Sequence, residues 1–147
     1  MSILADIFVS TPEAANDYAA SHLRGRPAHI TKYQPVEYNG LTSLEFGTLW
    51  ALIAGEEWDV KKHMLEEVSY GEGNESWLCR FQSPLVGLLA GLTDADIDRF
   101  AAAWAKTEEL EISGATGGDV RPIIIDLRRL AIAAQASNRG LYLWGSL

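Results

Sequence analysis

The stretch LTSLEFGTLWALIAG, residues 41–55, is the strongest indication of the fold in this sequence. Its large apolar residues recur at the i, i+3, i+4, i+7 spacing of one helix face, and they are Phe46, Leu49, Trp50 and Ile53. Thr42 and Glu45 have the spacing of a capping box, which starts a helix, and Gly55 suits the position just after its end. A helix that is apolar over so much of its circumference is mostly buried. We therefore expect this helix in the core.

The segments around this helix carry both strand and helix signals. Strands are predicted at both ends of the chain with helices between them, which favours a small mixed sheet packed against several helices. The 147 residues fit a single α+β domain, 1–147. The expected elements are strands at 3–9, 77–81 and 141–144, and helices at 12–20, at 58–67 with Asp59 as cap, from Ser83, from Thr93, and at 120–138 after a loop at 113–119 that ends in an Asp119 cap.

Composition and charge narrow the functional classes. Apolar residues make up 48% of the chain and charged residues 22%, which is typical of a folded globular domain. Twelve basic and 20 acidic residues give a net charge of −8, which disfavours nucleic acid as a partner. The apolar first ten residues contain Asp6 and lack a basic region, so neither a signal peptide nor a membrane span is expected, and we expect a cytoplasmic protein.

No catalytic motif is present in the sequence, and we expect no catalytic residue, no metal and no cofactor. Asp94, Asp96 and Asp98 have the spacing that begins a calcium-binding loop. Arg99 and Ala105 then occupy the positions that require Gly and Glu, so these acids are better interpreted as stabilising the start of a helix.

A single cysteine and a His–Glu pair are the other candidates for chemistry. Cys79 is alone, which excludes an internal disulfide and a thiolate metal cage. It shares a predicted strand face with Trp77 and Phe81, so we expect it to be a small core residue. His63 and Glu66 would share one face of the 58–67 helix, but two ligands are too few for a metal site, and a solvated helix face is expected.

Two groups of charged residues are candidates for binding. The acidic cluster Glu56, Glu57 and Asp59 could capture a basic partner, as could the acids at 66–67 and 108–111, although solubility and helix capping would also explain them. No acid occurs at 18–36, whereas five basic residues fall there: His22, Arg24, Arg26, His29 and Lys32. This basic segment could hold an anion or could simply balance neighbouring acids.

The order of elements resembles the YfbM-like domains, a bacterial family of unknown function. The resemblance rests on Leu44, Trp50 and Gly55 in the central helix, on Tyr70-Gly71, on Ser83-Pro84-x-Val86, and on Leu92-Thr93-Asp94. It implies a shared architecture, and it implies no residue role because the family has no established activity.

These observations favour a non-enzymatic domain that binds another protein, such as an acidic partner of the immunity or regulator type. The charge is segregated, and Trp and Arg, which dominate interface energies, are plentiful. The alternative is an enzyme or sensor that binds a small molecule or anion in a pocket near His22–Lys32. Homo-oligomerisation through a second stripe of the last helix, at Ile125 and Ile132, is a third hypothesis.

Overall fold

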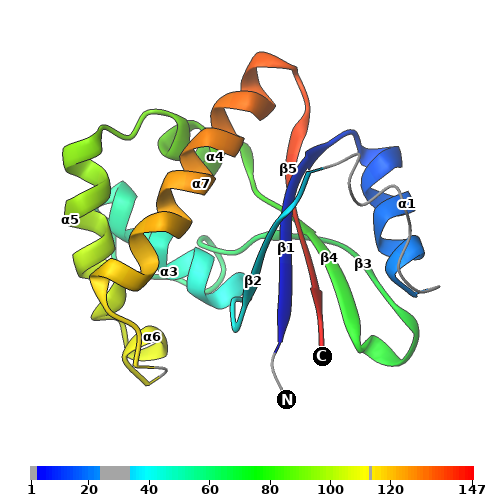
Figure 1. Ribbon diagram of the computed structural model, residues 1–147, viewed down its shortest axis with the longest axis horizontal. Coiled ribbons are helices and arrows are strands. Elements are labelled where there is room, and N and C mark those ends of the chain that lie inside the picture. The colour runs from blue at the N-terminus through cyan, green and yellow to red at the C-terminus, as the bar shows by residue number, and fades with distance from the viewer. Residues whose placement is uncertain (1–2, 24–33, 113) are drawn as a thin grey trace.

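The computed structural model describes residues 3–23, 34–112 and 114–147, and it confirms the α+β class (Figure 1). Side chains of residues 21–23 are outside this description. The elements in chain order are β1 (Leu4–Ser10), α1 (Pro12–Leu23), β2 (Val36–Asn39), α3 (Ser43–Ala54), β3 (Glu66–Tyr70), the short 3₁₀ helix η1 (Glu72–Asn74), β4 (Ser76–Arg80), α4 (Ser83–Ala90), α5 (Asp94–Ala105), α6 (Glu108–Ile112), α7 (Gly117–Ala136) and β5 (Gly140–Ser146).

The described strands form one sheet in the order β2-β1-β5-β4-β3, and every pairing in it is antiparallel. The expectation of a mixed sheet was therefore wrong in this respect. The reason lies in the connection before β5. The long helix α7 returns the chain to the end of the sheet where β1 finishes, so Gly140 starts opposite Ser10 and β5 runs back along β1 until Ser146 lies opposite Leu4.

The two faces of the sheet are covered unequally. Figure 1 shows α1 on one side of the sheet and α3, α4, α5 and α7 on the other. The larger core lies between the sheet and these four helices: α7 packs on β1 and β5, and α5 packs on α7 and α3. The smaller core under α1 is mostly aromatic, and it contains Phe8, Ala15, Tyr18, Leu78, Tyr142 and Trp144.

The central helix forms as its sequence predicts. Thr42 is the N-cap of α3 and its hydroxyl oxygen accepts the Leu44 N–H, while Gly55 ends the helix with a positive φ of 70°. Thr42 donates to the Glu45 carboxylate at 2.6 Å, a variant of the predicted capping box. In α7 the N-cap is Thr116 and Asp119 is its capping-box partner, so the predicted Asp119 cap was misplaced by three residues.

The predicted helix at 58–67 is absent. Asp59 begins a single turn, in which its carbonyl oxygen accepts the N–H groups of Lys62 and His63. The chain then extends into β3, where Glu66 pairs with Arg80 of β4. The strand pairing supplies hydrogen bonds that local sequence signals do not reveal, and it overrides the helical pattern.

Candidate functional site

The connection between α3 and β3, residues 55–65, is called the Trp58 loop here, and a buried histidine holds it to the core. His63 is 2% exposed, and its ring meets Trp50 edge-on at a centroid distance of 5.4 Å. Its Nδ1 accepts the backbone N–H of Asp59 at 3.0 Å. The expectation of a solvated helix face for His63 and Glu66 was therefore wrong, because His63 packs inside the fold and only Glu66 is exposed.

Two further contacts fix the backbone of the Trp58 loop. A Cβ placed on Gly47 of α3 would overlap the carbonyl oxygen of His63, so only glycine allows this close approach. Gln82, the residue before α4, donates from its side-chain nitrogen to the carbonyl oxygen of Met64 at 2.6 Å. Two elements far apart in the sequence thus hold the end of this loop.

The anchored loop presents apolar side chains to solvent. Trp58 is 44% exposed, Val60 57% and Met64 37%, although each is large enough to favour burial. The indole nitrogen of Trp58 would lie 3.5 Å from a Cβ on Gly47, so one edge of the ring rests on α3. A shallow hollow of about 550 Å³ runs along the loop between Glu56 and His63.

The structure brings the predicted acidic residues together on this loop, but it does not leave all of them free. Glu56 forms an ion pair with Lys62, and its other oxygen lies 3.4 Å from Nε2 of His63. The hydrogen bond from Lys62 holds the pKa of Glu56 below its usual range. Asp59 accepts the Lys61 N–H at 2.9 Å. Glu57 is exposed and has no ion-pair partner among the described residues.

The predicted basic candidates Arg24, Arg26 and His29 lie outside the described residues, as do Lys32 and the side chain of His22. The described chain resumes at Gln34, which has a positive φ of 48°. Gln34 borders a hollow that the sequence did not reveal.

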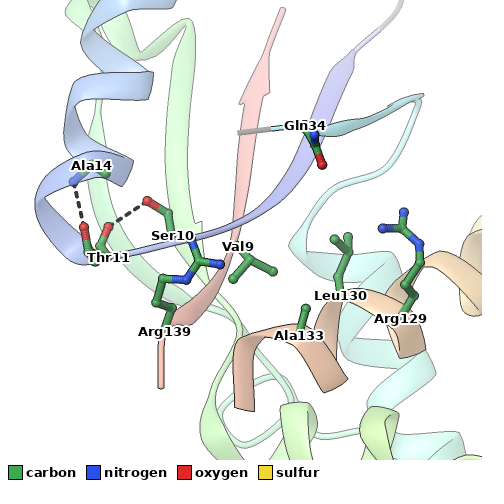
Figure 2. Close-up of a pocket in the computed structure, with 9 residues that line it drawn as sticks. All are labelled: Val9, Ser10, Thr11, Ala14, Gln34, Arg129, Leu130, Ala133 and Arg139. Carbon is green, nitrogen blue, oxygen red and sulfur yellow. Dashed lines mark hydrogen bonds between the residues drawn. The ribbon is translucent and has the colours of Figure 1, made fainter. Parts of the chain in front are cut away.

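That hollow, called the Arg139 hollow here, lies between the β1–α1 junction and the C-terminal half of α7 (Figure 2). Its volume is about 300 Å³. The apolar side chains of Val9, Leu130 and Ala133 lie at its centre, and polar groups surround them. The polar residues are Ser10, Thr11, Gln34, Arg129 and Arg139. Sequence reasoning missed both arginines, because only the antiparallel return of β5 brings the end of α7 beside the end of β1.

Both arginines of the hollow are held by hydrogen bonds. Arg139 donates from Nε to the Ser137 hydroxyl oxygen at 2.9 Å. Arg129 lies 3.4 Å from the Oδ1 atom of Asp126, whose other oxygen accepts the Tyr38 hydroxyl. Burial and the Asp126 carboxylate raise the pKa of Tyr38 well above its usual range, so its hydroxyl remains a donor. The Asp126 carboxylate therefore has two partners, the Tyr38 hydroxyl of β2 and the Arg129 guanidinium.

Cys79 occupies the inward strand face that the sequence predicts. It is 3% exposed and lies in the larger core with Phe81, and Trp77 packs partly against them. Burial raises the pKa of its thiol, which disfavours the reactive thiolate. The acids at the start of α5 also match their interpretation as helix-stabilising groups, because Asp96 completes a capping box with Thr93.

The part of the chain that the structure describes contains no cluster of metal ligands and no helix that could span a membrane. In the described ranges, no three His, Cys, Asp or Glu side chains gather where they could hold a metal ion. Among the same residues, no helix is both long enough and apolar enough to cross a bilayer.

Comparison with protein-family models, curated proteins and solved structures finds no match to this chain. The resemblance to YfbM-like domains therefore stays a prediction.

Proposed function

We propose that this domain binds another protein through the Trp58 loop. The observation that carries the proposal is a tryptophan exposed to 44% on a loop that a buried histidine and a glycine contact fix to the core. Tryptophan is among the residues that contribute most to interface affinity. A loop already fixed in place loses little conformational freedom on binding, so more of its contact energy becomes affinity.

The chemistry of the loop defines the partner we propose. The exposed apolar side chains of the loop, Trp58, Val60 and Met64, would fit an apolar pocket on the partner. The carboxylates of Glu57 and Asp59 would pair with cations at the rim of that pocket. Exposed acids continue into β3, so the surface beside the loop has the same sign. The net charge of −8 would attract a basic protein over a distance and raise its association rate. An immunity- or regulator-type protein that engages a basic target has this character.

The second apolar stripe on α7 is a weaker candidate for an interface. Ile132 is 49% exposed, but Ile125 packs partly against the core. One exposed isoleucine supplies far less than the roughly 800 Å² that each partner buries in a stable interface. The Trp58 loop therefore has better support than homo-oligomerisation through α7.

Selection from a displayed library of random peptides would test this proposal, because it requires only the domain and not its natural partner. We expect binders that combine Lys or Arg with apolar residues, and we expect their binding to protect the Trp58 loop from amide hydrogen exchange. Failure to enrich any binder, or protection confined to another surface, would contradict the proposal.

Charge substitution on the loop should slow the association of such a peptide. The double variant Glu57→Lys, Asp59→Asn keeps the side-chain oxygen that accepts the Lys61 N–H, and it changes the local charge by three. We expect its association rate constant to fall by about threefold or more at low salt, and the difference to shrink as salt screens charges beyond a Debye length of ~10 Å at 0.1 M.

The matched control is Glu108→Lys with Glu111→Gln on α6, which changes the net charge equally at another exposed site. Surface-based kinetics at two salt concentrations would measure both variants. Equal slowing by both variants would attribute the effect to net charge and count against the loop, and so would no slowing by either.

A further inference from the structure

We infer that the Arg139 hollow binds a small organic anion, with a phosphate or carboxylate group at Arg139 and an apolar body over Val9, Leu130 and Ala133. This site uses other residues than the Trp58 loop, so the inference stands independently of the proposed protein-binding function. It rests on the positive charge of the lining, on the position of Arg139, and on the polar groups that surround an apolar centre.

The charge of the lining is opposite to that of the protein. The chain carries a net charge of −8, yet the described residues that line this hollow include two arginines and no carboxylate. The acid that pairs with Arg129 is Asp126, and Asp126 also accepts the Tyr38 hydroxyl. A hollow lined by one sign of charge between low-dielectric walls focuses its field and raises the local concentration of anions.

Arg139 is positioned to receive an anion. Its Nε is engaged by Ser137, and no carboxylate among the described residues pairs with its terminal nitrogens. Figure 2 shows its guanidinium directed toward Val9 and Ser10, at one side of the hollow. The fork of terminal N–H groups matches two oxygens of a carboxylate or phosphate.

A third arginine adds to the positive charge around the turn between α7 and β5. Arg80 of β4 lies over the ring of Tyr142, and its Nε would be 3.1 Å from a Cβ on Gly140. Arg80 and Arg139 together border a second hollow of about 320 Å³. The turn is therefore flanked by cations on two sides.

The size and the surface of the Arg139 hollow limit the ligand. A volume of about 300 Å³ is at the lower end for small-molecule sites, which combine apolar walls with a few polar groups. Beside Arg139 lie Ser10, which is 1% exposed, and Thr11. An anionic group next to one apolar ring or short chain fits this arrangement better than a bare inorganic ion, which would leave the apolar centre unused.

An NMR titration with three one-ring probes tests this inference. We expect phenyl phosphate or benzoate to give saturable amide shifts at 9–11, 13–14, 129–133 and 139, and we expect uncharged benzyl alcohol to give none. The stronger of the two anions identifies the preferred group. Arg139→Gln should weaken its binding by about tenfold or more, as expected for loss of a charge-assisted hydrogen-bonded pair.

Two further arginine variants control the titration. Arg121→Gln removes a charge from the other end of α7, where Arg121 pairs with Asp98, and it should leave anion binding unchanged. Arg129→Gln should weaken binding less than Arg139→Gln does, because Asp126 already shares the charge of Arg129. It also provides a second test if Arg139→Gln proves unstable in thermal melts.

Three results would overturn the inference: equal shifts with benzyl alcohol, shifts scattered over the whole domain, or unchanged affinity in both Arg139→Gln and Arg129→Gln. Trp58→Ala should not affect the titration. Failure of the peptide-binding proposal and failure of the anion site are therefore distinguishable.

Discussion

Trp50→Ala is expected to lower the free energy of unfolding by about 3–5 kcal/mol, which is the usual cost of truncating a buried Trp. Trp50 is 5% exposed and supports His63, so its loss would leave a cavity under the Trp58 loop as well. Denaturant unfolding would measure the change. The matched control is Trp58→Ala, which removes the same side chain from a 44% exposed position and should cost less than about 1 kcal/mol. A loss at Trp50 as small as that at Trp58 would contradict the assigned packing of α3.

Gly47→Ala is expected to destabilise the domain by about 1–3 kcal/mol, although alanine is the better helix former. The new Cβ would overlap the His63 carbonyl oxygen, which belongs to the backbone and cannot rotate away. The loop would have to leave α3, and its amide signals should shift more than those of the sheet.

Gly87→Ala in α4 is the control for helix propensity. A Cβ at Gly87 would meet its nearest neighbour, the Gln135 side chain, at 3.9 Å, which is ordinary contact. This variant should stabilise the domain by about 0.5–1 kcal/mol. If Gly47→Ala is also stabilising in denaturant unfolding, the close approach of the loop to α3 is wrong.

Elements whose signals are local could be predicted from the sequence. The helix α3 has its cap at Thr42, its stop at Gly55 and its apolar stripe within fifteen residues, and each feature acts between near neighbours. The start of α5 is similar, since Thr93 and Asp96 cap each other three residues apart. The inward position of Cys79 followed from the alternation of β4 alone.

Features that depend on distant contacts could not be predicted. The strand β3 exists because β4 pairs with it, and His63 is buried because Gly47 lets its backbone approach α3. The acidic cluster was recognisable, but the pairing of Glu56 with Lys62 depends on the turn at Asp59. The Arg139 hollow joins residues more than 100 positions apart, so no spacing in the sequence indicates it.

The most direct test of the central claim is the affinity of the Trp58→Ala variant for the tightest peptide selected on the wild-type domain. Isothermal titration calorimetry would compare it with Ile132→Ala, which truncates an exposed apolar residue on α7. If the Trp58 loop is the binding surface, Trp58→Ala should lose about 2 kcal/mol or more of binding free energy, roughly thirtyfold in Kd, and Ile132→Ala should stay within about twofold. A Kd for Trp58→Ala within about twofold of wild type would contradict the claim, because an interface hot spot costs far more when truncated.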